Sequence, residues 1–339
     1  MSLPPSGEIP QGAIRFNTDS QRLEFYAQGE WWVMSTDTPN LGQGSDSTPG
    51  PRGFAFGCVA GNGYNNYYIN IASTGNAIDF GDFADTRYFC SATADRTRAV
   101  VDSGEGGMTT KEFFTMASGG GGTNFGNVSY HSSNGHRAAG AVGNGTRAVF
   151  AGGDDFVTYS FNDIEYVTIQ STGNAVDFGD LVQATRLCAS GNSPTRGVFG
   201  GGDGGPALTS VIQFISTATL GNSQNFGDTS LTRQGIGGCS NATRMVMAGG
   251  QYPSVTDTID YIEIAAGGQA VDFGNLTVTK YISAASSSPT RGVWAGGAPG
   301  NQNVIDYVQI ATRGDAVDFG DLLELTYCNG GCSNAHGGL

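Results

Sequence analysis

The sequence predicts an all-β fold: a six-bladed β-propeller with four-stranded blades, preceded by a small β-hairpin module. Three observations lead to this prediction. The chain of 339 residues repeats six times at a period near 48 residues; it holds 55 Gly without ten residues of helical periodicity; and each end of its repeat region lacks a strand that the other end supplies. Self-similarity at roughly 40–50 residues is typical of propellers, whose unit is one small sheet.

Three columns of matching residues define the repeat. The first is the Phe of stretches such as "VDFGDL", with intervals from 45 residues (Phe80 to Phe125) to 53 residues (Phe125 to Phe178). The second is the Arg of stretches such as "TRGVF", and the third is an aromatic residue that lies between them. The columns are Phe80, Phe125, Phe178, Phe226, Phe273 and Phe319; Arg52, Arg98, Arg147, Arg196, Arg244 and Arg291; and Tyr68, Phe113, Tyr166, Phe214, Tyr261 and Tyr307.

Each unit contains four stretches with the pattern of short strands. They are exemplified by "TRGVFGGG", "VIDYVQIA", "AVDFGDL" and "TRLCASGNS", with Gly, Asn and Ser at their boundaries. The repeat region opens on a first strand at Pro51–Gly57 and stops on a fourth strand at Cys328–His336. We therefore expect these two segments to pair in one blade, which closes the ring and removes two open sheet edges.

The Gly pairs that end the first strands resemble a known pattern. Each pair is followed by an aromatic residue, as in the kelch family of β-propellers; the pairs are Gly152-Gly153, Gly201-Gly202, Gly249-Gly250 and Gly296-Gly297. The chain departs from that family at the Trp late in each kelch repeat, where the Phe of "DFG" takes a comparable place. The resemblance implies a fold and says little about function, because kelch propellers include enzymes, ligand traps and scaffolds.

The first fifty residues carry none of the three columns. The segment "GAIRFNTDSQRLEFYAQGEWWVM" predicts strand, turn, strand, turn, strand, with apolar side chains alternating as Ile14, Phe16, Leu23, Phe25, Trp31 and Val33. A meander this small is barely stable alone. We expect a hairpin module at residues 1–35, a linker at 36–50 and the propeller at 51–339. The expected anchoring residues are Ile14, Phe16, Phe25, Trp31 and Trp32.

This module is similar to short hairpin modules of bacteriophage tail fibres and other virion structural proteins. The matching residues are Gly12, Ile14, Arg15, Phe16, Asn17, Thr18, Asp19, Glu24, Tyr26, Gly29 and Trp31. The resemblance implies an anchoring or oligomerising module at the head of a virion appendage. It therefore implies that other virion proteins are partners, that the chain forms a homo-oligomer, and that it is located in a virion assembled in the host cytoplasm.

Composition excludes several classes of partner. A net charge of -14 disfavours nucleic acid and anionic membranes. The chain has no run of 18 apolar residues, so we expect no membrane insertion. Its N-terminus lacks the basic flank and apolar core of a secretory signal. The six Cys do not form a disulfide framework for a chain of this length, so we expect free thiols.

The motifs that could carry chemistry have structural interpretations. "DFG" recurs around a ring without the other motifs of a kinase, and "GGGGTNFG" from Gly119 lacks the Lys of a phosphate-binding loop. The Asp residues near each "DFG" are expected to pair with the Arg column and with Arg87, Arg186, Arg233 and Lys280; a calcium-binding ring is the alternative. Cys328 and Cys332 are a weak candidate for zinc. We expect no catalytic residue, no cofactor and no metal.

One class of loop varies between the units while the columns stay fixed. It joins each Gly pair to the aromatic column, and Tyr, Phe, Asn, Asp and Gln dominate it. Planar rings beside amides and carboxylates suit sugars or polar protein surfaces. The expected binding residues are Tyr64, Asn65, Asn66, Asp154, Phe156, Tyr159, Tyr252, Asn301 and Gln302.

Taken with the resemblance of the hairpin module, these patterns predict a non-enzymatic phage virion protein of the tail-fibre type. Its propeller would bind a host-surface glycan or protein, or a neighbouring virion subunit. A capsid decoration protein is the closest alternative. A glycan-acting enzyme and a cellular kelch-type scaffold are alternatives of other classes; the enzyme would need two acids facing each other across a cleft.

Overall fold

The computed structural model describes residues 9–17, 22–33, 50–60, 63–85, 87–104, 108–129, 136–155, 157, 159–327 and 330–339. These residues form strands, turns and irregular backbone, and none of them belongs to a helix. A helix able to span a bilayer is accordingly not found among them. The chain divides into two compact units, Met1–Gly50 and Pro51–Leu339.

The first unit contains a three-stranded antiparallel sheet in the order β1-β2-β3, formed by Ile14–Asn17, Arg22–Ala27 and Glu30–Val33. On one face, the Arg15 guanidinium forms an ion pair of 2.8 Å with Glu24. It also lies 4.1 Å from the centroid of the Trp31 ring, which packs 5.3 Å from Tyr26. The side chains of this face therefore pack against one another.

The opposite face of this sheet is apolar and exposed. Ile14 is paired with Phe25, and Phe25 with Trp32, so these side chains share the face. Ile14, Phe16 and Trp32 are 61%, 60% and 49% exposed. The expectation that Trp31 shares the face of Phe25 is wrong, because the tight turn at Gln28-Gly29 sets a register that pairs Trp31 with Tyr26.

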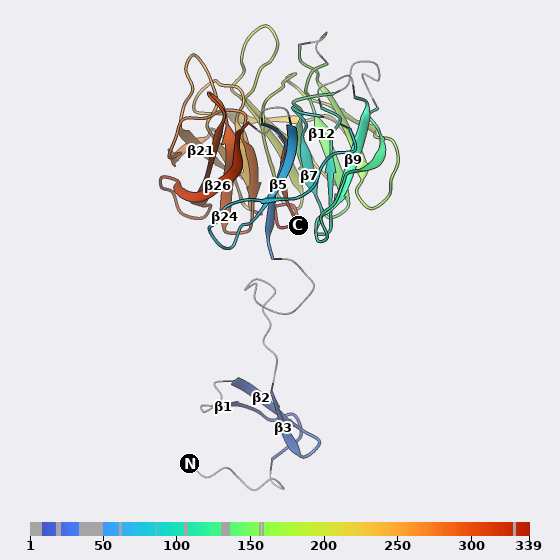
Figure 1. Ribbon diagram of the computed structural model, residues 1–339, viewed down its shortest axis with the longest axis vertical. Coiled ribbons are helices and arrows are strands. Elements are labelled where there is room, and N and C mark those ends of the chain that lie inside the picture. Colours follow the sequence, from blue (N-terminus) through green and yellow to red (C-terminus); the bar gives the residue numbers. More distant parts are fainter. Residues whose placement is uncertain are drawn as a thin grey trace. The chain divides into compact units, whose positions relative to one another are not determined.

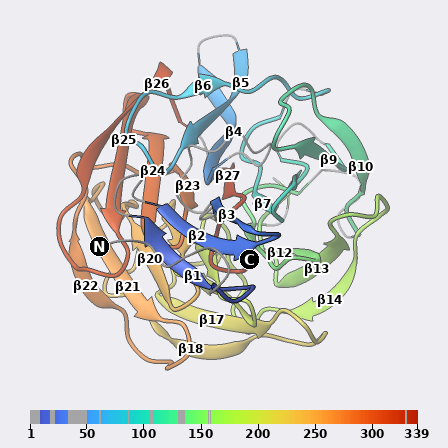
Figure 2. The same ribbon diagram turned by 90° about the horizontal axis from the view of Figure 1, so that it is seen from below.

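The second unit contains six four-stranded antiparallel sheets, numbered here 1 to 6 along the chain (Figures 1 and 2). Sheet 1 has the order β27-β4-β5-β6, and sheet 2 has the order β7-β8-β9-β10. Sheets 3 to 6 follow in chain order from β11 to β26. The bounds in sheets 1 and 2 are β27 Gly330–Ser333, β4 Arg52–Ala60, β5 Gly63–Asn70, β6 Ile78–Asp79, β7 Ala92–Ala94, β8 Arg98–Val101, β9 Thr110–Thr115 and β10 Thr123–Asn127.

Sheets 3 to 5 have strands of matching length, whereas β24, β25 and β26 of sheet 6 are longer. The bounds in these four sheets are β11 Gly140–Gly143, β12 Arg147–Ala151, β13 Asp163–Thr168, β14 Val176–Asp180, β15 Ala189–Asn192, β16 Arg196–Gly200, β17 Val211–Ser216, β18 Gln224–Asp228, β19 Gly237–Ser240, β20 Arg244–Ala248, β21 Thr258–Glu263, β22 Val271–Asn275, β23 Ala284–Ser287, β24 Arg291–Gly297, β25 Gln302–Gln309 and β26 Val317–Thr326. This all-β architecture is consistent with a β-propeller.

Sheet 1 brings the two ends of the repeat region together. Strand β27 pairs antiparallel with β4, with Cys332 opposite Phe54 and Ser333 opposite Gly53. This is the pairing that the sequence predicts for the first and last segments of the repeat. The innermost strands β7, β11, β15, β19, β23 and β27 each contact the next, and β27 contacts β7 (Figure 2).

The three sequence columns meet in every sheet. In sheet 4 the Arg196 guanidinium lies 4.7 Å from the centroid of the Phe214 ring, and that ring packs edge-on against Phe226 at 6.0 Å. The other five sheets repeat this arrangement. The sequence repeat therefore corresponds to a cluster of three side chains that recurs in each sheet.

Each column arginine also joins its sheet to the next. Arg196 donates from Nη1 to the carbonyls of Ile264 and Ala265 at the end of β21, at 2.9 and 3.1 Å. All six arginines follow this rule, and Arg291 of sheet 6 bonds the carbonyls of Ile71 and Ala72 in sheet 1. Each column arginine thus bonds the backbone of a neighbouring sheet.

The "DFG" motif serves packing between neighbouring sheets. Its Phe lies in each of the six buried apolar clusters, so the prediction that it packs between sheets is confirmed. In sheets 2 to 6 the Gly lies at or beside a register shift. At Gly179, φ is 144° and an added Cβ would lie 2.6 Å from the backbone of Gly221. This close approach lets Gly221 donate to the Phe178 carbonyl at 2.8 Å.

The expected pairing of the "DFG" carboxylates with the Arg column is wrong. Those arginines bond carbonyls and aromatic rings instead, and Asp177, Asp272 and Asp318 lie exposed. Other buried bases pair with carboxylates on the third strand of a sheet. These pairs are Arg87–Glu112, Arg233–Asp260 and Lys280–Asp306.

The expectation of six free thiols is also wrong. Cys58 is disulfide-bonded, whereas Cys90, Cys188, Cys239 and Cys332 are free and buried. Burial raises the pKa of the Cys188 thiol to about 12, so it stays protonated and inert. Cys328 lies outside the described residues.

We predict that replacing a column arginine loosens the joint between two sheets. Arg196→Met keeps an aliphatic chain over Phe214 but removes the charge and the two bonds to sheet 5. We expect a loss of about 1–3 kcal/mol in the free energy of unfolding. Urea denaturation measures it, with the exposed Arg313→Met as matched control. Equal effects of both substitutions would contradict the role of the column.

Candidate functional site

The variable loops lie at the end of each sheet away from the Arg column. The second strand starts at its column arginine, as β12 does at Arg147, and runs to the opposite end before the chain turns into the third strand. The loop between β12 and β13 spans residues 152–162, and the loops of the other sheets occupy the same end. Pro51, where the chain enters this unit, lies at the Arg end.

An ionic network holds two of these loops in place. Arg137 pairs with Asp154, Asp154 also pairs with Arg186, and Arg186 pairs with Asp203 at 2.9 Å. Backbone bridges join the same partners, Arg137 with Asp154 and Arg186 with Asp203. Burial would lower the pKa of Arg186, but hydrogen bonds to Asp154 and Asp203 outweigh it and raise the pKa. The guanidinium is therefore a fixed positive charge.

Tyr159 covers this network with an exposed ring. The Arg186 guanidinium lies 4.3 Å from the ring centroid, and Tyr159 is 61% exposed. The neighbouring Ser160 donates to the Asp203 carbonyl at 2.8 Å, which ties the loop of sheet 3 to sheet 4. An exposed ring fixed over a cation is a preorganised flat surface, of the kind that stacks on a sugar or another ring.

Two of the expected binding residues are buried. Asp154 is 1% exposed and bonded to two arginines. Asn66 is 0% exposed; its Oδ1 accepts from Gly57 at 3.0 Å and its Nδ2 donates to the Gly81 carbonyl at 2.9 Å. Both side chains hold loops and do not present a surface to a ligand.

The remaining expected residues are spread over several loops. Tyr252 is 64% exposed on the β20–β21 loop. Asn301 is half-buried, and Gln302 donates to the Thr279 carbonyl at 3.0 Å. Asn65 donates to the Tyr67 hydroxyl at 3.1 Å. Phe156 and the side chain of Tyr64 lie outside what the structure describes.

Sequence reasoning assigned Arg186 to structural pairing and missed Arg137 and Asp203 as parts of this face. A signal was available for Asp203, since "GGDD" and "GGDG" place an Asp directly after the Gly pair in two neighbouring units. The partners of that Asp come from the connection before each next sheet, which no local pattern relates to it.

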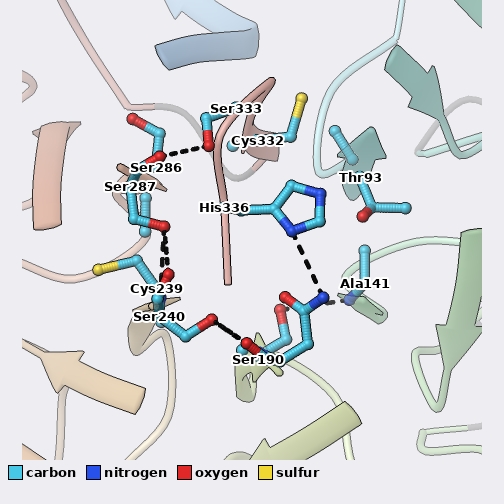
Figure 3. A pocket seen from close by; sticks show the side chains of 16 residues that line it. Thr93, Ala141, Ser190, Cys239, Ser240, Ser286, Ser287, Cys332, Ser333 and His336 are labelled. Atoms are coloured by element: carbon cyan, nitrogen blue, oxygen red, sulfur yellow. Dashed lines mark hydrogen bonds between the residues drawn. The ribbon is translucent and has the colours of Figure 1, made fainter. Parts of the chain in front are cut away.

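A small polar cavity lies among the innermost strands. Figure 3 shows Ser190, Ser240, Ser287, Ser333 and His336 around it. The hydroxyls bridge consecutive strands: Ser240 donates to the Asn192 carbonyl at 2.8 Å, and Ser287 donates to the Ser240 carbonyl at 2.7 Å. Small residues make this close approach possible. The cavity measures about 40 Å³, room for roughly one or two waters.

The C-terminal tail completes this ring of hydrogen bonds. His336 is buried and donates from Nε2 to the Ala94 carbonyl at 2.6 Å, at a strand position where no hydroxyl is available. Its Nδ1 accepts from the Gly338 amide at 3.1 Å, and Gly337 donates to the Ser240 carbonyl at 3.0 Å. The tail thus packs His336 against the inner strands as a neutral ring.

A buried ionic cluster in sheets 2 and 3 has the composition of a metal site. Asp102, His136 and Glu165 offer ligand atoms that all lie within 4.8 Å of one another. The Lys111 Nζ, however, lies 2.6 Å from Glu165 Oε1 and also pairs with Asp102. Its ammonium already occupies the place of a cation between the two carboxylates.

No protein-family model matches the chain, and no curated protein matches it. The function is therefore inferred from the residues of this chain.

We predict that acid loosens the C-terminal tail through His336. Burial lowers the pKa of His336 in the folded protein, outweighing its bond to the Ala94 carbonyl. The unfolded chain takes up the proton first, so the stabilisation is present above the unfolded pKa of about 6.5 and is lost as the pH falls. His336→Gln should therefore cost more stability at pH near 7.5 than at pH near 5. Thermal unfolding at both pH values measures the two differences; a pH-independent difference would contradict the role of His336.

Proposed function

We propose that this chain is a non-enzymatic structural protein of a bacteriophage particle, of the tail-fibre or appendage type. Its first unit attaches the protein to other particle proteins and promotes homo-oligomerisation. Its second unit presents the loop face to a glycan or protein on the host surface. The observation that carries the proposal is the exposed apolar face of the first sheet, with Ile14, Phe16 and Trp32 about half or more exposed.

The apolar face supports attachment because, among the described residues, no other apolar surface of the small sheet covers it. The other face already buries Tyr26 and Glu24 against Arg15 and Trp31. A three-stranded sheet gains independent stability from packing one apolar face against something else. A contiguous exposed apolar patch of this kind marks an interaction site.

The second unit is proposed to be a closed, six-bladed, kelch-like propeller. Three series of contacts support this, and each runs from sheet 1 to sheet 6 and back to sheet 1. They are the contacts between the innermost strands, the bonds of the column arginines, and the backbone bonds that a glycine of one sheet donates to the "DFG" Phe carbonyl of its neighbour. Such a frame holds its loops at low ordering cost on binding. Several copies in one particle would multiply weak contacts.

The loop face is proposed to bind a glycan or a polar protein surface. Tyr159 and Tyr252 offer exposed rings, while Arg186 and Gln302 supply fixed polar groups near the loops. Aromatic rings with low conformational entropy beside polar groups are typical of binding surfaces that use loops on a rigid frame.

We predict that Tyr159→Ala and Tyr252→Ala each weaken binding of the purified chain to host cells or to a glycan array. Loss of an exposed aromatic contact costs about 1–2 kcal/mol, or roughly five- to thirtyfold in affinity. Val176→Ala, on the exposed side of β14, is the matched control and should bind normally. Normal binding by both tyrosine variants would contradict the proposal that the loop face binds the host surface.

The same assay separates the alternatives. Release of reducing sugar from a bound glycan would show an enzyme and contradict the proposal. Absence of any host binding, together with density for the chain on capsid faces in particle images, would indicate a decoration protein instead.

We predict that the first sheet is required for assembly. Phe16→Ser with Trp32→Ser makes the apolar face polar, and we expect failure to enter particles or to form oligomers, while the second unit stays folded. Sedimentation gives the oligomeric state, and circular dichroism gives the fold. Gln28→Ser, at the exposed turn of the same sheet, is the control. Normal assembly of the double variant would contradict attachment through this face.

A further inference from the structure

Sheet 2 carries a buried charged pair where its neighbours carry apolar residues. Val101 at the end of β8 pairs with Glu112 in β9. The next residues beyond this pair are Asp102 and Lys111, so these two lie opposite each other. The corresponding cross-strand pairs in sheets 3 to 6 are Ala151–Ile164, Gly200–Ile212, Ala248–Ile259 and Ala295–Ile305. The fold therefore accepts a small residue and an isoleucine here.

The pair is fully enclosed. Lys111 and Asp102 side chains are both 0% exposed, and the Lys111 Nζ lies 4.0 Å from the centroid of the Phe150 ring. The same Nζ lies 2.6 Å from Glu165 Oε1, and His136 Nδ1 lies 2.8 Å from Asp102 Oδ2. A buried ion pair is weak as a stabilising device, since well-packed apolar residues of similar volume often stabilise as much or more. Its presence at an apolar position therefore points to chemistry.

We propose that Lys111 and Asp102 join in an intramolecular isopeptide bond, formed by the folded chain itself. The bond links Lys111 Nζ to Asp102 Cγ. The arrangement supplies all the parts of such a reaction: an enclosed amine, a carboxyl group in contact with it, a second carboxylate to accept a proton, and an imidazole to donate one.

The reaction balances without any added reagent. Glu165 accepts a proton from the Lys111 ammonium, and the free amine attacks Asp102 Cγ to form the C–N bond. His136 and the protonated Glu165 each give one proton to the departing Asp102 oxygen, the C–O bond breaks and water leaves, and the second proton of the nitrogen passes to His136. The two protons lost from nitrogen depart with that oxygen, so Glu165 and His136 finish in the states in which they began.

The charges of the cluster explain why the reaction needs both Glu165 and His136. Burial alone would raise the pKa of Asp102, but Lys111 and His136 outweigh it and hold the pKa well below its usual range. Burial alone would lower the pKa of Lys111, but Asp102 and Glu165 raise it. The neighbouring pair Arg87–Glu112 compensates itself. The reactive acid and amine thus arise by proton transfer inside the cluster, once in the life of each molecule.

The chain contains an internal comparison. It has two lysines, Lys111 and Lys280, and Lys280 is also fully buried and paired with Asp306 at 2.8 Å. The other described bond of the Lys280 Nζ goes to the Val304 carbonyl at 3.1 Å, and a carbonyl cannot accept a proton as a base does. Lys280 is therefore expected to remain a free amine.

Mass spectrometry of the full chain tests the proposal. We expect an intact mass one water below that of the sequence, a single joined peptide that contains Asp102 and Lys111, and no cleavage after Lys111 by a lysine-specific protease in denaturant. Cleavage after Lys280 should be complete. A chain of full sequence mass that is cleaved after Lys111 would overturn the proposal, and so would a water loss that maps to another position.

Variants test the role of each residue in forming the bond. Lys111→Ile with Asp102→Ala restores the pattern of the neighbouring sheets and should fold with the full mass of its sequence. Glu165→Gln should slow the linkage on the order of a hundredfold, while Asp102→Asn should lose ammonia in place of water. If Glu165→Gln does not fold, the wild-type mass still decides; if it folds and links at the normal rate, Glu165 has no part in the reaction.

Discussion

The stacking of one arginine on one aromatic ring is the interaction on which the second unit depends. In sheet 4, Arg196 covers Phe214, which packs against Phe226, and the same guanidinium bonds the backbone of sheet 5. One side chain thereby fixes the orientation of its own sheet and the distance to the next. Every sheet repeats this contact. The glycines of "DFG" then bring the outer strands close enough to bond.

Periodicity made most of this architecture predictable from sequence. Columns that recur at a constant interval reveal strands, sheets and the complementary end segments, because each sheet meets the same packing constraints. The partners of the arginines were not predictable, since backbone carbonyls carry no residue-specific signal. Trp31 was misplaced because one residue of register moves a side chain to the other face. Asn66 and Asp154 were taken for surface residues because polarity alone does not reveal burial among partners.

Sheet 2 shows how a repeat can be altered locally without loss of the frame. Its column residues Arg98, Phe113 and Phe125 keep their contacts, while Asp102 and Lys111 introduce charge at core positions. The loops vary in the same manner, at the end that the column arginines leave untouched. The molecule thus separates positions that determine shape from positions that are free to acquire a role.

The antiparallel pairing of β27 with β4 has a consequence for biosynthesis. The strand that completes the first sheet is translated after the other strands of the second unit, and the His336 segment follows it directly. While the ribosome still covers these residues, β4 offers an unsatisfied edge to any neighbouring nascent chain.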